Sequence, residues 1–214
     1  MHFFFEIKQF CLYIGQIKTL ARKTQAMIPR MTLDIGWFDL TYGLISSMGP
    51  KTPNYSSVED LWLSEQSLAF FSVRSAWDSF LATRNWPKGS EVLMSAITIP
   101  HMADIIRAWG YIPVPVDLSI DDMSPKLDSI ERLASNKTKA ILIAHLFGGF
   151  VDLNPIEKLC KQRNWLLIED CAQAYDSSQY RGHEGADLSL FSFGTIKSAT
   201  ALGGAMVTVR NSSL

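Results

Sequence analysis

Four polar side chains in the last third of the sequence have types and positions that suit carbonyl chemistry. Glu169 and Asp170 follow one short apolar run, and Ser192 and Lys197 lie at and just beyond the end of another. A carboxylate beneath an aromatic heterocycle keeps a ring nitrogen protonated, and a lysine shielded from water forms an imine with an aldehyde. A hydroxyl shortly before that lysine suits a phosphate group. Because a single Asp after a strand is more often a turn former, the hypothesis depends on the joint arrangement.

The elements that must position these residues follow the pattern of an α/β protein with a mainly parallel sheet. From Ala69 onward, short apolar runs alternate with helical segments, and runs this apolar are typical of parallel strands covered on both faces. The predicted strands are 91–96, 112–116, 140–146, 166–169, 188–193 and 205–209. Crossover helices are predicted over 102–109 and 155–163. Ligands collect beyond the carboxyl ends of parallel strands, which is where the four polar residues fall.

The residues before this pattern predict a separate lead-in. We expect residues 1–68 to form an N-terminal extension and loop-rich lead-in, and residues 69–214 to form one large domain. Residues 35–55 are rich in Gly, Ser and Pro without clear periodicity, so we expect a loop there. The aromatic start over 1–18 contains Glu6 and Lys8 and is too polar for a signal peptide or a membrane span. It is interpreted as a peripheral helix, or as an extension upstream of a start near Met27 or Met31.

Composition excludes several classes of function. The chain has 214 residues, 47% of them hydrophobic and 19% charged, with a net charge of -1 and its Lys and Arg spread along the sequence. It therefore lacks the basic footprint of a protein that binds nucleic acid or an anionic membrane, and small molecules are the expected partners. Cys11, Cys160 and Cys171 show no metal-ligand or disulfide spacing, so we expect no metal site and a cytoplasmic location.

A set of motifs in the second half resembles the DegT/DnrJ/EryC1/StrS family of sugar aminotransferases, which use pyridoxal 5'-phosphate (PLP) and have the type I fold. The motifs are His-Leu-Phe-Gly at 145–148, Ile-Glu-Asp-Cys-Ala-Gln-Ala at 168–174, Gly-Ala-Asp at 185–187, and Phe-Ser-Phe-Gly-Thr-Ile-Lys at 191–197 followed by Gly-Gly at 203–204. They occur in the family's order and at its spacing. Weaker similarity runs back to Ser72.

The resemblance implies a role for each matching position. Lys197 would carry PLP as the internal aldimine and later move the proton between the substrate and the cofactor. Asp170 would face the pyridine nitrogen, Gln173 the phenolic oxygen, and Ser192 the phosphate.

A second part of the phosphate site is implied further upstream. The segment 71–76 stands where the family has a turn that opens a helix, so the backbone amides of Val73 and Arg74 would bind the phosphate. Val73 replaces a common Gly, which narrows the backbone's approach to the phosphate. Ile99 stands where an aromatic residue normally stacks on the ring, so His101 is either its replacement or a surface histidine.

The resemblance also implies substrates and partners. The family aminates a nucleotide-linked keto sugar, with an amino donor such as glutamate, in a homodimer whose site lies at the subunit interface. Family members continue through a C-terminal domain, so this chain is expected to be a fragment or a truncated form. Two alternatives stay open: a catalytically inactive binding or regulatory protein with a PLP fold, and a PLP lyase acting on amino acids. Lys197 favours the aminotransferase, because relatives that dehydrate sugars carry His there.

Overall fold

The structure, a computed structural model, describes residues 35–48, 62, 66–175 and 179–211. The contacts within the chain separate two compact units, Met1–Leu33 and Asp34–Leu214, and the described residues all belong to the second. The expected peripheral helix over residues 1–18 lies outside them.

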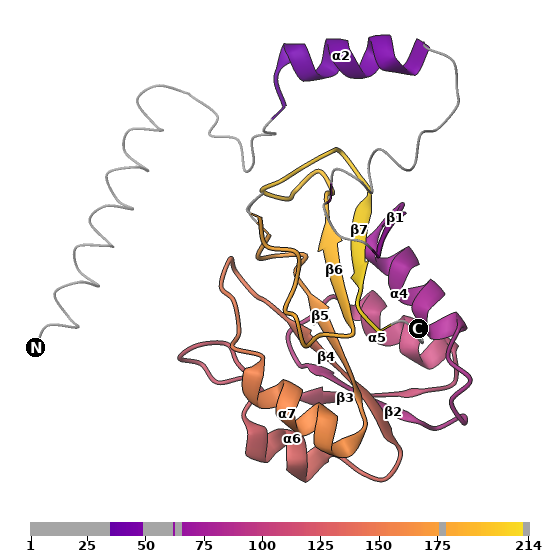
Figure 1. Cartoon of the computed structure of the whole chain (residues 1–214), viewed down its shortest axis with the longest axis vertical. Coiled ribbons are helices and arrows are strands. Elements are labelled where there is room, and N and C mark those ends of the chain that lie inside the picture. The colour runs from indigo at the N-terminus through magenta and orange to yellow at the C-terminus, as the bar shows by residue number, and fades with distance from the viewer. Residues whose placement is uncertain (1–34, 49–61, 63–65, 176–178, 212–214) are drawn as a thin grey trace, which may run out of the picture. The chain divides into compact units, whose positions relative to one another are not determined.

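Seven strands form one sheet in the order β1-β7-β6-β5-β4-β2-β3 (Figure 1). The neighbouring pairs from β3 across to β6 are parallel. β7 runs antiparallel to β6 on one side and to β1 on the other. The mainly parallel sheet predicted from the sequence is confirmed, with β7 as the exception. The bounds are β1 (Ser67–Phe70), β2 (Glu91–Ser95), β3 (Ile112–Val116), β4 (Thr138–Ala144), β5 (Leu166–Asp170), β6 (Leu188–Ser192) and β7 (Ala205–Val209).

Helices cover both faces of this sheet. The first face carries α4 (Val73–Ala82) and α5 (Pro100–Ala108), and the second carries α6 (Leu127–Leu133) and α7 (Asn154–Arg163) (Figure 1). The core under α4 and α5 includes Trp77, which is fully buried and stacks on Phe80 with ring centroids 5.3 Å apart. The core under α6 and α7 includes Ile130 and Ile156. The side chains of β2, β4 and β5 alternate between these two cores, so the middle of the sheet is apolar on both faces.

One expectation for the lead-in is wrong. Residues Trp37–Met48 form helix α2 rather than a loop. The apolar residues Leu44 and Met48 recur at helical spacing after Trp37, whereas Gly43 and Ser46 fall on the opposite side and obscured the periodicity in the sequence. None of the described helices has the length and apolar character needed to cross a bilayer.

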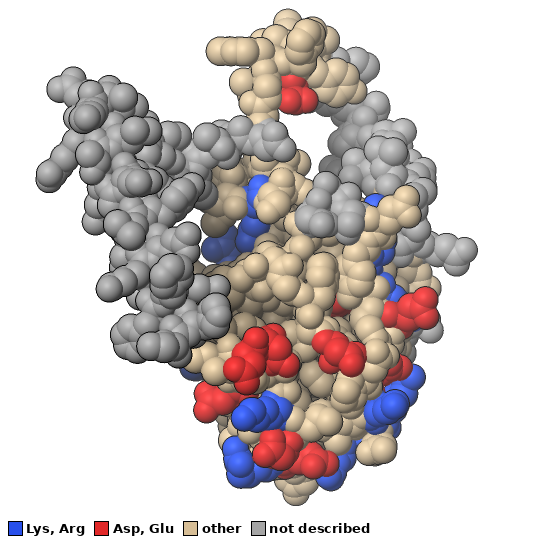
Figure 2. Space-filling model, turned by 90° about the vertical axis from the view of Figure 1, so that its left-hand side faces the viewer, with Lys and Arg blue, Asp and Glu red and all other residues tan. Residues whose placement is uncertain are grey.

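Charged side chains of both signs are mixed over the lower part of the face shown in Figure 2. This mixture agrees with the even spread of Lys and Arg along the sequence.

Candidate active site

A cavity of about 340 Å³ lies where the carboxyl ends of β4, β5 and β6 meet the N-terminus of α4. Six of the seven predicted site residues line it: Val73, Arg74, Asp170, Gln173, Ser192 and Lys197. The topology explains this convergence, because parallel strands deliver the residues that follow them to one edge of the sheet.

The cavity brings together a buried carboxyl group and a partly buried amine. Asp170 is the last residue of β5, on the same side of the strand as the core residue Ile168, and its Oδ1 accepts a hydrogen bond of 2.9 Å from the backbone N–H of Ala172. Burial raises the pKa of Asp170. Lys197 lies in the turn after β6, where burial lowers its pKa and the negative charge of Asp170 opposes that shift. The site therefore favours an uncharged amine more than bulk water does.

The N-terminus of α4 forms the opposite side of the cavity. Ser72 caps this helix: its hydroxyl accepts a hydrogen bond of 3.1 Å from the backbone N–H of Ser75, and the Ser75 side chain accepts one of 3.0 Å from the N–H of Ser72. The first amides of a helix have no partner within it and carry partial positive charge, so this end suits an anion. The Val73 side chain is buried in the core next to Ala76, which orients the first turn.

The structure places His101 apart from the other predicted residues. It is the second residue of α5 and is exposed, whereas Ile99 and Met102 on either side of it line the cavity. Its stacking role therefore stays a prediction.

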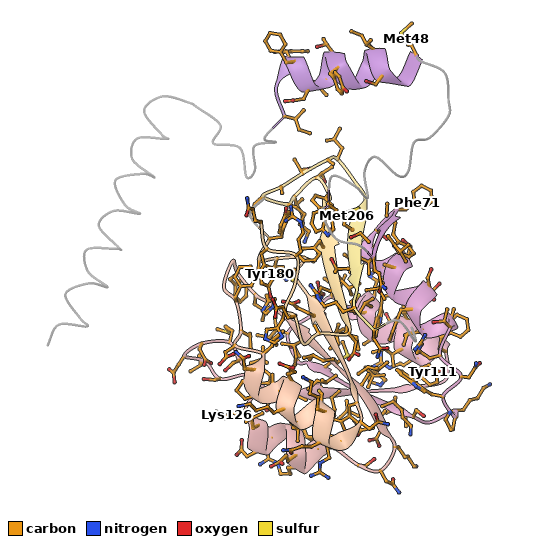
Figure 3. All side chains as sticks on the ribbon, in the orientation of Figure 1. Met48, Phe71, Tyr111, Lys126, Tyr180 and Met206 are labelled. Atoms are coloured by element: carbon orange, nitrogen blue, oxygen red, sulfur yellow. The ribbon has the colours of Figure 1, made fainter. Side chains whose placement is uncertain are left out.

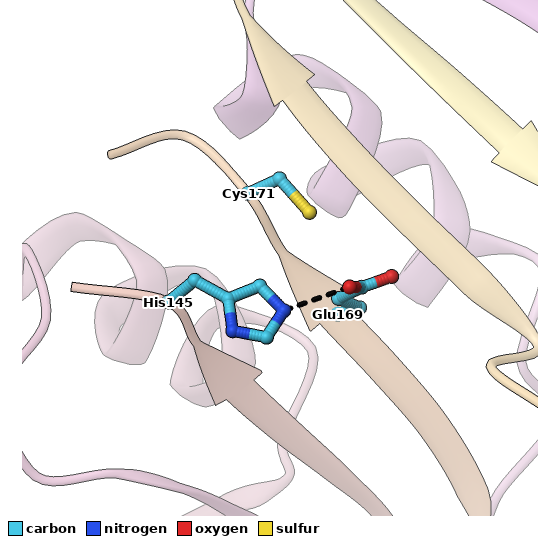
Figure 4. A group of neighbouring side chains, drawn as sticks. All are labelled: His145, Glu169 and Cys171. Atoms are coloured by element: carbon cyan, nitrogen blue, oxygen red, sulfur yellow. Dashed lines mark hydrogen bonds and ion pairs between the residues drawn. The ribbon is translucent and has the colours of Figure 1, made fainter. Parts of the chain in front are cut away.

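Behind Asp170 lies a buried network: Glu169 was predicted near the site from the sequence, but its contact with His145 was not. Glu169 and His145 are fully enclosed, with the Glu169 Oε1 and His145 Nε2 atoms 2.7 Å apart (Figure 4). Glu169 also accepts hydrogen bonds from the hydroxyls of Tyr180 and Ser189. The sequence did contain one signal for this network: Glu169 lies inside an apolar strand, and a buried charge requires hydrogen-bond partners.

Cys171 brings a third potential metal ligand to this network, with its sulfur, the imidazole and the carboxylate within 4.8 Å of one another (Figure 4). Both ring nitrogens of His145 are already engaged, Nε2 with Glu169 and Nδ1 with the backbone N–H of Val151 at 2.9 Å. Burial also raises the pKa of the Cys171 thiol, which disfavours the thiolate that a metal needs. We therefore assign the cluster to hydrogen bonding.

A larger cavity, of about 500 Å³, lies beside α4 and β7. Its lining is mostly apolar, with Leu68, Phe80 and Val207 among its members, and contains no Lys, Asp, Glu or His. It offers no group suited to the chemistry described above.

Solved structures define the class of fold. The putative sugar aminotransferase Spr1654 from Streptococcus pneumoniae, in its PLP form, superposes with a TM-score of 0.74 at 24% identity, over 86% of this chain and 53% of that chain. The sugar aminotransferase CalS13 from Micromonospora echinospora gives a TM-score of 0.69 at 26% identity, over 86% of this chain and 54% of that chain. The chain thus has the fold of the large domain of these enzymes.

Sequence comparison defines the family. The model of the DegT/DnrJ/EryC1/StrS aminotransferase family matches residues 45–214, and this chain belongs to that family. GDP-perosamine synthase from Escherichia coli O157:H7 is 36% identical over 130 residues, which cover 59% of this chain and 35% of the relative. The enzyme of the same name from Vibrio cholerae is 30% identical over 129 residues, with the same shares of the two chains. The chain therefore spans about a third of the length of these curated relatives.

Proposed function

We propose that this chain is the cofactor-binding part of a PLP-dependent aminotransferase that acts on a nucleotide-linked keto sugar, with Lys197 as the lysine that binds PLP. The observation that carries the proposal is the meeting of Asp170, Lys197 and the N-terminus of α4 in one cavity. Membership of a sugar aminotransferase family supports it.

The residues of the cavity fit the chemical groups of PLP. Burial raises the pKa of the Asp170 carboxyl group, because its negative charge is costly there without a cationic partner. A protonated pyridine nitrogen is such a partner. The Lys197 amine, with its lowered pKa, suits the aldehyde. The end of α4 and the hydroxyl of Ser192 suit the phosphate. The cofactor, when bound, supplies an electron sink for the carbon that loses or gains a proton.

Each residue then has a defined task in the proposed reaction. Asp170 holds the proton on the ring nitrogen through its carboxylate, and Gln173 faces the phenolic oxygen. Nζ of Lys197 moves the proton to and from the reacting carbon of the substrate, because its lowered pKa makes the uncharged amine, the form that accepts a proton, more accessible than in water.

Substrates and partners follow the same proposal. The relatives are named GDP-perosamine synthase and sugar aminotransferase, which supports a nucleotide-linked keto sugar as acceptor and an amino acid such as glutamate as donor. Exposed apolar side chains at or next to the cavity support a homodimer that covers them: Phe71, Ile99, Phe147 and Ile196. Phe71, labelled in Figure 3, is 95% exposed and stands directly before the cap residue of α4. A cytoplasmic location belongs to the same proposal.

The test is the absorbance of the purified chain with added PLP, followed by borohydride reduction and peptide mapping. We expect a new band in the violet region and a label on Lys197, because this amine is the one whose pKa burial lowers beside the cavity. Lys197→Ala should abolish both, whereas Lys158→Ala on the exposed side of α7 should change neither. A label spread over surface lysines, or one that persists in Lys197→Ala, would refute the assignment.

A further inference from the structure

The Glu169 carboxylate is the centre of a buried hydrogen-bond network that joins several segments of the chain. Its Oε1 accepts from Tyr180 and contacts His145 Nε2, and its Oε2 accepts from the hydroxyl of Ser189 at 2.7 Å and the backbone N–H of His183 at 2.8 Å. Burial alone would raise the pKa of Glu169, but the hydrogen bonds outweigh it and lower the pKa to about 2. The group is therefore a fully enclosed carboxylate that stays ionised.

These contacts select one form of His145. Nδ1 accepts a hydrogen bond from the backbone N–H of Val151, so the ring proton must be on Nε2, where it is donated to Glu169. The imidazole is thus neutral, with its orientation set at both nitrogens. The residue His145 borders the same cavity as Asp170, and its backbone N–H donates to the carbonyl of Asp170 at 3.0 Å.

The loop after β5 is held by the same carboxylate. Tyr180, labelled in Figure 3, and His183 belong to the second described stretch of that loop, 179–187. Gly182 has a φ of +101°, and a Cβ there would overlap the hydroxyl of Ser189, so the loop packs tightly on the network. Ser189 in turn accepts a hydrogen bond of 2.9 Å from Arg210, just beyond β7. The network therefore links β4, β5, β6 and the end of β7.

We propose that Glu169 is a positioning residue of the candidate active site: its buried carboxylate accepts the Nε2–H of His145, whose Nδ1 is held as an acceptor by the Val151 N–H, and its negative charge acts on Asp170 at the edge of the cavity. A neutral His145 leaves Lys197, and a cation bound in the cavity, as the partners for the Asp170 charge. The identity of that bound cation as the PLP ring rests on the proposed function.

The charged groups around Asp170 decide whether its proton affinity is raised or lowered. Lys197 follows β6, Glu169 precedes Asp170 on β5, and Arg74 of α4 lines the same cavity. Burial is the largest cause of the raised pKa of Asp170. The backbone N–H of Ala172 and the charge of Lys197 oppose it, as would a charge on His145. The negative charge of Glu169 raises the pKa further. The same negative charge would stabilise a protonated ring nitrogen next to Asp170.

The first measurement needs neither a variant nor a cofactor. Long-range proton–nitrogen NMR spectra of the cofactor-free chain report which ring nitrogen of each histidine carries a proton. The chain has four histidines, so His145 can be assigned by elimination with variants of the other three. We expect the ring proton of His145 on Nε2, with Nδ1 unprotonated, because Nδ1 accepts from Val151 and Nε2 faces Glu169. A proton on Nδ1, or a positively charged ring, would overturn the proposal.

The second measurement follows the Asp170 carboxyl group in the cofactor-free chain by carbon NMR during a pH titration, in wild type and Glu169→Gln. Removing the buried charge should weaken the proton affinity of Asp170 several-fold, so that it titrates at lower pH. Glu131→Gln is the matched control, because it removes one exposed carboxylate outside the network. If Asp170 titrates alike in all three proteins while Glu169→Gln remains folded, Glu169 has only a structural role and the proposal fails.

The outcomes separate this proposal from the proposed function. With PLP bound, the pH at which the cofactor absorbance changes should fall in Glu169→Gln and stay unchanged in Glu131→Gln. If the wild-type chain shows the His145 and Asp170 signatures but labels no lysine with PLP, the positioning role is supported and the assigned cofactor is wrong.

Discussion

At the scale of single residues, Asp170 has opposite effects on stability and on the proposed chemistry. It is a buried carboxyl group whose pKa is raised by burial, so the folded chain binds its proton more tightly than the unfolded chain does. Without a bound cation, stability is therefore lost as the pH rises from the ordinary carboxyl range through the raised pKa, and the loss persists at neutral pH. The same charge is what a protonated pyridine requires.

Asp170→Asn should separate these two effects. The amide keeps an oxygen for the N–H of Ala172 but carries no charge, so the cofactor-free variant should melt a few degrees above wild type at neutral pH. Transamination should fall by about 100-fold or more while PLP still binds, because one buried electrostatic partner is lost. Thermal unfolding at neutral and acid pH checks the first effect. A variant that is less stable than wild type by the same amount at both pH values would contradict it.

At the scale of elements, the N-terminus of α4 depends on its cap. Ser72→Ala removes the side-chain acceptor for the N–H of Ser75 and should cost about 1 kcal/mol of unfolding free energy. It should also weaken PLP binding, since a frayed first turn no longer holds its amides towards the phosphate. Ser79→Ala, at an exposed position of the same helix, is the control. Urea unfolding measures the first effect and a PLP titration the second. Equal stability of the two variants would exclude a capping role.

The sequence predicts the elements of the sheet better than the short helices. The runs 112–116 and 205–209 coincide with β3 and β7. β7 is a mostly buried strand, for which a continuous apolar run is typical, whereas β3 is an edge strand in which only Val116 is fully buried. α6 has only seven residues, too few for a clear helical period, and was not predicted. α2 was missed because small residues dilute its apolar face.

The candidate site could also be predicted only in part from the sequence. Residues directly after strands were placed correctly at one edge, since parallel topology alone brings them together. The partners of Glu169 come from β4, β6 and a loop, and finding them requires strand register: Glu169 lies opposite Ser189. Apolar periodicity does not determine register between strands that are distant in sequence. The exposure of His101 could not be predicted either, because it depends on the direction in which the first turn of α5 points its side chains.

At the scale of the whole molecule, the Glu169 network should contribute to the response of the fold to acid. The pKa of Glu169 falls from 4.5 to about 2 on folding, so its contribution is fully present above 4.5 and is lost as the pH falls towards 2. A shift of this size corresponds to about 3 kcal/mol. The difference in unfolding free energy between wild type and Glu169→Gln should therefore narrow as the pH falls through this range. Urea unfolding at several pH values measures it, and a constant difference would show that the charge of Glu169 does not stabilise the fold.

The antiparallel position of β7 has a consequence for the order of folding. β1 pairs with no other described strand than β7, and Ser67 lies opposite Thr208. During synthesis β1 must therefore wait until β7, the last of the seven strands along the chain, has left the ribosome before it has a neighbour to pair with. Pairing across so long a separation is slow, because the entropy of closing the loop is lost before any contact compensates for it. The β1 edge should form last, and until then the nascent sheet exposes the free side of β7 to other chains.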